Sequence, residues 1–170
     1  MDRQPREILV RNLLRAEWDQ SETFGLTPDI SFGWYVESKG VPQLLVRAPD
    51  EGPLGGGETG YDAIDGSGGI PNQTISGVID VHGMADASDL DAATTDFPDV
   101  YLSGNESQHG AMAEVRRIAR ENYSAPTDPE TGNRPVNTLA PGDSQEVPDD
   151  GAGTREAHYL VEVGYTFTTN

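Results

Sequence analysis

Two residues of this sequence have a spacing that could supply metal ligands. Asp80 and His82 are separated by a single residue. The other histidines, His109 and His158, have no neighbouring ligand at a recognised spacing, and a structural zinc site takes four protein ligands. We therefore interpret Asp80 as a solvated acid near the end of a strand, and we expect no metal site here.

Three acids further along the chain resemble a calcium loop. They are Asp86, Asp89 and Asp91. An EF-hand needs oxygen ligands at fixed positions and a glycine within the loop, and this sequence has neither that spacing nor that glycine. We interpret the three side chains as solvated acids.

A glycine-rich stretch at 55–57 and 68–69 could cradle a phosphate, but the required context is missing. No Lys-Ser/Thr pair follows it, and no G-x-G-x-x-G sequence opens a helix. No serine lies in a G-x-S-x-G sequence either. The sequence predicts no catalytic, cofactor-binding or metal-ligating residues, so we expect a protein that is not an enzyme and that uses no cofactor.

The charge composition is that of a salt-adapted protein. A formal net charge of −18 comes from 29 acidic and 11 basic residues, and Lys39 is the single lysine. At about 1 M salt the Debye length falls to ~3 Å, so surface carboxylates no longer repel one another strongly. We interpret the chain as halophilic; an ordinary acidic protein is the alternative. The same charge disfavours specific nucleic-acid binding, which relies on Lys and Arg at phosphates.

Length and hydropathy predict a protein made in the cytoplasm, without a membrane anchor. The 170 residues are about one domain's worth, and 35% hydrophobic content suffices for a modest core. The first residues start no apolar segment typical of a signal peptide, and no apolar run approaches the ~20 residues of a membrane span. Without cysteines, disulfides and thiolate metal sites are excluded.

The stretch 5–18 predicts a first helix with an unusually wide apolar arc. Such an arc indicates burial against two surfaces, the core and a neighbouring subunit, with Leu9, Leu13 and Trp18 as interface candidates. Deeper burial within its own domain is the equal alternative. Ile8 is an apolar exception on the polar side. The arc contains Leu9, Val10, Leu13, Leu14, Ala16 and Trp18, and the polar side contains Arg11, Asn12 and Arg15.

The stretch 107–123 predicts a second helix, with Ser107 as a candidate cap. Its arginines point away from the apolar face. Arg117 can pair with acids on the same helix, whereas Arg116 and Arg120 need acids from elsewhere. In so acidic a protein a like subunit would supply them, so we expect Arg116 and Arg120 at a subunit interface; a solvated face is the alternative. The apolar face is Ala111, Met112, Val115, Ile118 and Ala119.

Alternating patterns predict four strands. The stretch 30–36 and the stretch 43–47 look like a hairpin around the turn 38–42, and 74–82 is a third strand. The clearest alternation is at 158–168, which we expect to be an antiparallel strand buried on one side. Helix, three strands, helix and strand together predict a single α+β domain over 1–170, a mostly antiparallel sheet with two helices packed on it.

Two long stretches, about 48–72 and 125–153, match no regular element. The first is rich in glycine and the second in proline. Irregular loops longer than ~12–15 residues are uncommon in compact domains unless they are functional or disordered. We interpret them as arms ordered by partners, with simple disorder as the alternative.

This layout resembles the tail-completion, or tail-terminator, proteins of long-tailed viruses. The resemblance lies in the order and pattern of segments over most of the chain, and the halophilic composition makes it similar to a protein of a haloarchaeal tailed virus. The matching segments are Ile8-Leu9-Val10, Leu13-Leu14, Gly40-Val41-Pro42, Leu44-Leu45-Val46, Gly77-Val78-Ile79-Asp80-Val81, the helix 112–118, His158-Tyr159 and Val163-Gly164-Tyr165-Thr166-Phe167.

The resemblance implies a structural virion protein at the neck, made in the host cytoplasm. Members of this family form rings, usually hexameric, that cap the tail tube and join it to the head. The implied partners are further copies of the chain, the tail-tube protein and a head-completion or connector protein. Double-stranded DNA would pass through the lumen without specific binding. The candidate lumen acids are Asp62, Asp65, Asp86, Asp89 and Asp91.

Two other functions remain open. The chain could be a different connector of the same virion, such as a head-completion stopper or adaptor. From another class, it could be a halophilic regulator that binds a small molecule or a protein. A closed oligomer in high salt would favour the ring, and a monomer or dimer would favour the regulator.

Overall fold

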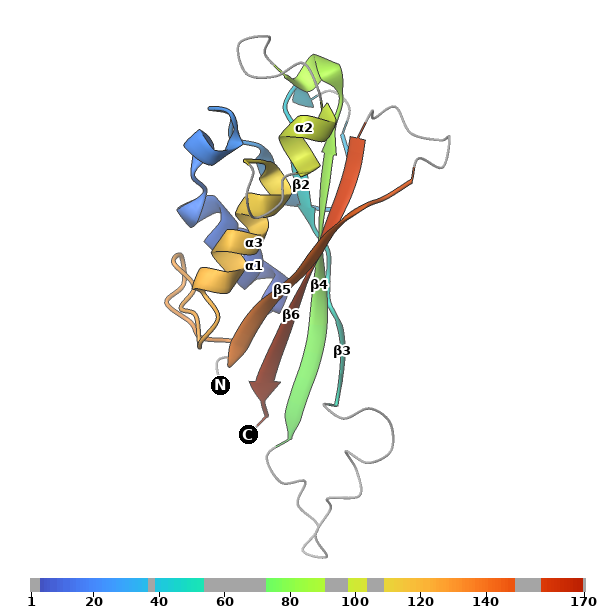
Figure 1. Cartoon of the computed structure of the whole chain (residues 1–170). Coiled ribbons are helices and arrows are strands. Elements are labelled where there is room, and N and C mark those ends of the chain that lie inside the picture. The colour runs from blue at the N-terminus through green and yellow to red at the C-terminus, as the bar shows by residue number, and fades with distance from the viewer. Residues whose placement is uncertain are drawn as a thin grey trace, which may run out of the picture.

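The computed structural model is built around a six-stranded mixed sheet (Figure 1). It describes residues 4–36, 39–53, 73–90, 98–103, 109–148 and 157–169. The strand order is β1-β2-β4-β6-β5, with β3 also pairing with β4, and β1–β2 is the parallel pair. The predicted mostly antiparallel α+β fold is confirmed. The strands are β1 (Asp29–Phe32), β2 (Gln43–Val46), β3 (Asp50–Pro53), β4 (Thr74–Ala85), β5 (Thr138–Glu146) and β6 (Ala157–Thr168).

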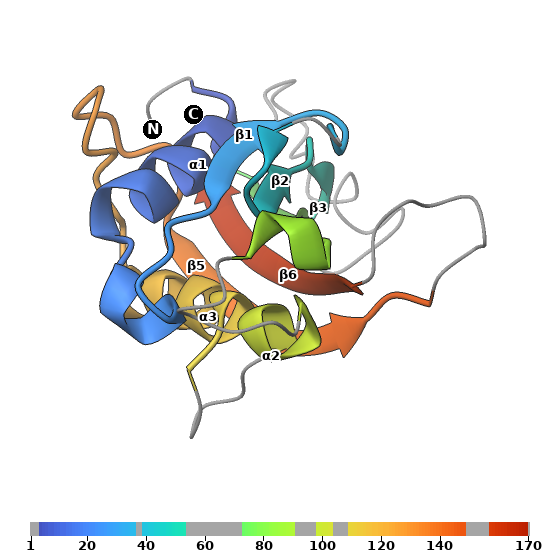
Figure 2. The ribbon, with the colours of Figure 1, turned by 90° about the horizontal axis from the view of Figure 1, so that it is seen from above.

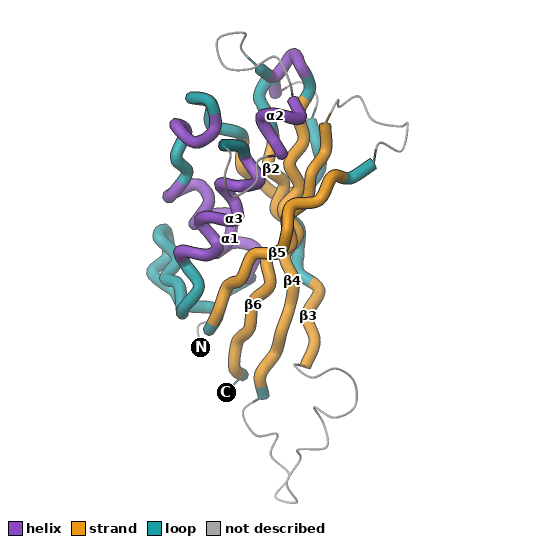
Figure 3. Tube along the Cα trace, viewed as in Figure 1, coloured by secondary structure: helices purple, strands orange, loops and turns teal. Residues whose placement is uncertain are grey.

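Helices lie on one face of this sheet, as the view from above and the tube trace show (Figures 2 and 3). The predicted helices 5–18 and 107–123 correspond to α1 and α3. Helix α1 begins after Pro5. Helix α3 begins after Gly110, which occupies the cap position, later than predicted, and the proposed cap Ser107 lies outside the described residues. The short helix α2 was not predicted. The helices are α1 (Arg6–Glu17), α2 (Pro98–Ser103) and α3 (Ala111–Glu121), with 3-10 turns η1 (Gln20–Thr23) and η4 (Ala87–Asp89).

The predicted hairpin between 30–36 and 43–47 is wrong, because β1 and β2 run parallel. Gly33, with φ +95°, ends β1 in a conformation that favours glycine. The described parts of the crossover to β2 are residues 33–36 and 39–42. The buried side chain of Gln43 holds this crossover, donating to the carbonyl of Val36 (2.6 Å) and accepting from its N–H (3.0 Å).

Two strands fall within the stretches predicted as irregular. Strand β3 lies end to end with β2 along β4, so that β2 and β3 form one interrupted partner of that long strand. Strand β5 pairs with β6 at the other edge of the sheet and contains Pro141 and a bulge before Ser144. Proline and bulges are tolerated at an edge, where one side needs no ladder hydrogen bonds.

The core lies between the sheet and helices α1 and α3. The apolar faces predicted for the last strand and the second helix are confirmed by burial. In β4, by contrast, Val78 points away from this core and is exposed. The main core residues are Leu9, Val10, Leu13 and Leu14 of α1, Met112, Val115 and Ile118 of α3, Ile79 and Val81 of β4, and Val161, Val163 and Tyr165 of β6.

A buried polar cluster fastens the proline-rich stretch to α1. The side chain of Asn12, predicted on the polar side of the helix, is buried and donates to both carboxylate oxygens of Asp128 (3.1 and 3.0 Å). Gln4 and the backbone N–H groups of Glu130 and Thr131 donate to the same carboxylate. Residues 128–131 are therefore ordered by their own chain and not by a partner.

Candidate functional site

The sheet face away from the helices is open around Asp50, Val78 and Glu162, whereas Leu45 and Met84 on the same face are buried. Residues pairing across β4 and β6 on this face include Asp80, which lies opposite Glu162. Asp50 of β3 and Glu162 are exposed. Lys39 pairs with Asp29 at the β1 side of the sheet, with a nitrogen–oxygen distance of 2.6 Å. The opposed carboxylates of Asp80 and Glu162 repel each other in dilute solution and much less in molar salt.

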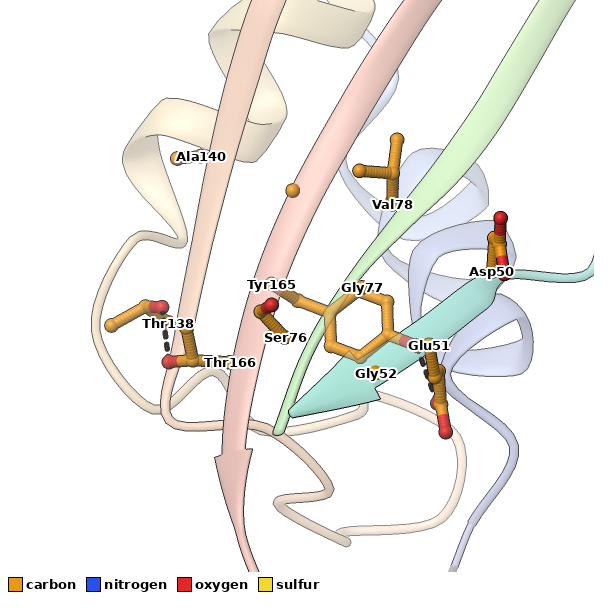
Figure 4. A pocket seen from close by; sticks show the side chains of 11 residues that line it. Asp50, Glu51, Gly52, Ser76, Gly77, Val78, Thr138, Ala140, Tyr165 and Thr166 are labelled. Carbon is orange, nitrogen blue, oxygen red and sulfur yellow. Dashed lines mark hydrogen bonds between the residues drawn. The ribbon is translucent and has the colours of Figure 1, made fainter. Parts of the chain in front are cut away.

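A shallow groove of about 580 Å³ crosses this open face (Figure 4). It exists because Gly52, Gly164 and Ala140 contribute little or no side chain there. On its walls, the hydroxyls of Thr138 and Thr166 hydrogen-bond to each other at 2.7 Å. Hydroxyls and small residues can contact a flat partner surface, but the groove brings together no nucleophile and base.

The first three predicted interface residues are placed elsewhere than expected. Leu9 and Leu13 are buried in the core of their own chain, with Leu9 fully inaccessible. Trp18 is half-buried, and its indole N–H donates to Thr23 at 3.2 Å. The expectation that Leu9 and Leu13 meet a neighbouring subunit is therefore wrong, because α1 packs these side chains against the sheet and against α3; burial in the chain's own core accounts for them.

Two of the arginines of helix α3 contact acids of their own chain. Arg116 donates to the carbonyl of Gly142 (2.9 Å) and lies 3.5 Å from the Asp143 carboxylate, both on β5. This contact corrects the expectation that Arg116 needs a like subunit. Arg117 bridges Glu114 and Glu121 as predicted.

Arg120 is exposed on the same helix and lines a small pocket with Glu22 and His109. His109 pairs with Glu22 at 2.7 Å. The predicted interface role of Arg120 stays a prediction.

The candidate lumen acids are divided between a capping box and segments outside the described residues. Asp86 and Asp89 are buried around η4: Asp86 accepts from Tyr35 (2.8 Å), and its N–H donates to Asp89 (2.8 Å). Burial raises the pKa of Asp89 above its usual value. Buried caps cannot line a channel, so the expectation for this pair is wrong. Asp62, Asp65 and Asp91 lie outside the described residues.

A contact between two histidines was not predicted. The Nδ1 atom of His82 lies 2.8 Å from the Nε2 atom of His158, with ring centroids 5.0 Å apart. Sequence spacing hides this pair because it depends on the register of β4 against β6. Two imidazoles alone do not complete a structural metal site, and no cluster of three metal-ligating side chains occurs among the described residues.

No protein-family model matches the sequence, and no curated protein matches it. In the part of the chain that the structure describes, no helix has the length and apolarity to cross a bilayer.

Proposed function

We propose that this chain is a structural subunit that assembles into a ring at the neck of a haloarchaeal long-tailed virus. In this role it acts as a tail-terminator or tail-completion protein that caps the tail tube. The observation that carries the proposal is the one-sided sheet: helices cover one face, and the other displays Asp50, Asp80 and Glu162. The sequence resemblance to tail-completion proteins adds to it.

An acidic open face suits a conduit for DNA. A wall rich in Lys and Arg would hold phosphates, since each neutralised phosphate adds salt-dependent affinity. Carboxylates repel the phosphates and leave a duplex free to slide. In the proposed ring, the face that carries Asp80 and Glu162 lines the lumen in place of the buried pair Asp86 and Asp89.

The direct test is the mass and shape of the protein in about 2 M salt, where carboxylate repulsion is screened. Light scattering should give a closed oligomer, six times the chain mass of 18.3 kDa for a hexamer. Electron microscopy should show a central opening wider than a ~20 Å duplex, with carboxylates outnumbering guanidiniums on its wall. A monomer, a filled ring or an arginine-rich wall would contradict the proposal.

Binding to partner proteins distinguishes a tail terminator from a head-completion stopper or adaptor. A tail terminator should bind the end of the tail tube and stop its growth in a polymerisation assay. A head-completion stopper or adaptor would instead bind the connector of the filled head. Double-stranded DNA should show no measurable affinity at the lowest salt that the fold tolerates, because the open face is acidic.

A further inference from the structure

An exposed apolar groove lies where α1 meets the ends of β1 and β2. Trp34 is 77% exposed and Phe32 39% exposed. With Ile8 of α1 and Arg47 after β2, they line a groove of about 400 Å³, which we call the docking groove; the carboxylate-bearing Glu7 of α1 lines it as well. Exposed apolar clusters of this kind are uncommon on monomeric proteins and mark interaction sites.

The docking groove explains two features that the core leaves without a role. The alternation of Ile30, Phe32 and Trp34 predicts one buried face, yet only Ile30 is buried, because β1 ends before Gly33. Ile8 is the apolar exception on the polar side of α1, and it lines the groove. Ile8, Phe32 and Trp34 are thus apolar side chains that lie outside the core, which indicates that a binding partner covers them.

Two guanidiniums lie over the exposed rings. The Cζ atom of Arg47 is 4.3 Å from the centroid of Trp34, and that of Arg11 is 4.6 Å from the centroid of Phe32. Such cation–π contacts contribute about 0.5–2 kcal/mol in general. Of the two arginines, Arg47 lines the groove.

Arg47 differs from its neighbours in lacking an acidic partner. Arg6 and Arg11 each lie near a carboxylate of their own chain. Within the described residues no carboxylate pairs with Arg47, and its buried Nε atom donates no hydrogen bond there. Glu7 lines the same groove but forms no ion pair with Arg47, so this half-buried guanidinium can still donate to a carboxylate from outside.

We propose that the docking groove binds a second copy of this chain, which places an apolar contact against Trp34 and a carboxylate against Arg47. Charge complementarity with Arg47 favours this occupant, because each copy carries 29 acidic residues against 11 basic ones. Trp and Arg side by side are also the residues that most often dominate interface affinity. The inference rests on the proposed self-assembly but not on the neck location.

The two sheet edges favour a side-chain contact over strand addition. One edge is formed by β1 and β3, which have four residues each, and Arg15 already donates to the carbonyl of Ile30 of β1 at 2.8 Å. At the other, Pro141 and a bulge interrupt β5. Short, bulged or proline-containing edges resist pairing with another chain, so the copies meet through the docking groove.

The test measures self-association of the full chain in about 2 M KCl over a range of concentrations, by sedimentation and light scattering. Trp34→Ala and Arg47→Glu should each raise the dissociation constant at least ~10-fold. Matched controls lie elsewhere: Tyr123→Ala removes another exposed aromatic ring, and Arg134→Glu makes the same charge change at another exposed arginine. Both controls should stay within ~2-fold of the unsubstituted chain. Circular dichroism verifies that each variant folds.

Tryptophan fluorescence reports whether the docking groove is covered. The chain has two tryptophans, so Trp18→Phe leaves Trp34 as the single reporter. Its emission should move to shorter wavelength as concentration rises, because the exposed ring becomes covered. Emission that is independent of concentration in an associating sample would overturn the proposal.

The outcomes also separate this inference from the proposed ring. A ring that survives both Trp34→Ala and Arg47→Glu overturns the docking groove and leaves the neck function standing. A dimer that Trp34→Ala dissociates supports the groove and contradicts the ring. A chain that stays monomeric at every concentration overturns both.

Discussion

The ring of Tyr165 on β6 lies against the backbone of Gly77 on the neighbouring strand β4. A Cβ atom at Gly77 would lie 2.4 Å from both the Cζ atom and the hydroxyl oxygen of this tyrosine. The hydroxyl donates to the Glu51 carboxylate of β3. Burial, reinforced by that carboxylate, raises the pKa of Tyr165 above its usual value. The contact thus joins three strands through one side chain and needs a glycine.

Gly77→Ala should destabilise the protein by about 1–3 kcal/mol, because the added methyl group forces the Tyr165 ring to move. Gly52→Ala on the adjacent strand is the matched control, since nothing lies within 4 Å of its Cβ position. The control should change stability by less than ~0.5 kcal/mol. Denaturant unfolding in high salt measures both, and equal effects would contradict the close packing.

Asp128→Asn should destabilise the protein by about 1–3 kcal/mol near pH 6, because an amide nitrogen would face the donors of Asn12 or Gln4. Burial alone raises the pKa of Asp128, but hydrogen bonds from Gln4, Glu130 and Asn12 outweigh it and lower the pKa below the usual value.

The sign of this pH dependence follows from the lowered pKa. The carboxylate of Asp128 stabilises the fold above its unfolded pKa, about 3.9 for an aspartate, and this stabilisation is lost as pH falls through the folded pKa. The stability difference between the natural chain and Asp128→Asn should narrow below about pH 4. A difference that stays constant from pH 6 to pH 3 would show that the carboxylate charge is not involved.

Val161→Asp or Val163→Asp should prevent folding or cost several kcal/mol, of the order of the whole stability. Both valines are buried in the centre of the sheet. Glu162→Gln, between them on the exposed face, is the control and should leave the fold intact. Soluble, folded aspartate variants in high salt would disprove the packing of β6 against the helices.

Dilution well below ~1 M salt should unfold the protein or separate its copies, because unscreened carboxylates repel. Asp80→Asn tests the same effect locally, since Asp80 lies opposite Glu162. The variant should be more stable by about 0.2–1 kcal/mol in dilute buffer and no more stable in molar salt. A chain that keeps full thermal stability in dilute buffer would contradict the halophilic interpretation.

Local periodicity was sufficient to predict the elements that bury one face. The alternation along β6 and the helical spacing of Met112, Val115 and Ile118 each match the observed burial. These patterns are visible because burial on one side repeats every two residues in a strand and every three or four in a helix.

Contacts between distant segments could not be predicted from such patterns. Asn12 and Asp128 are 116 residues apart in sequence, and nothing near either residue signals the other. Strand β5 was missed because Pro141 and Gly142 are unfavourable in most strands, although an edge accepts them. The stretch 30–36 was predicted as one continuous strand, so the docking groove was missed. The positive φ of Gly33 ends the strand and leaves Trp34 outside the sheet.

The position of β6 has a consequence for how the chain folds during synthesis. This strand follows every other described strand in the sequence, yet it lies between β4 and β5 in the sheet. Until it leaves the ribosome, β5 has no strand neighbour, and β4 keeps one unpaired side along its length. Nascent chains that lack this strand should expose the unpaired edges of β4 and β5 and the apolar side of α3. They should therefore bind chaperones readily.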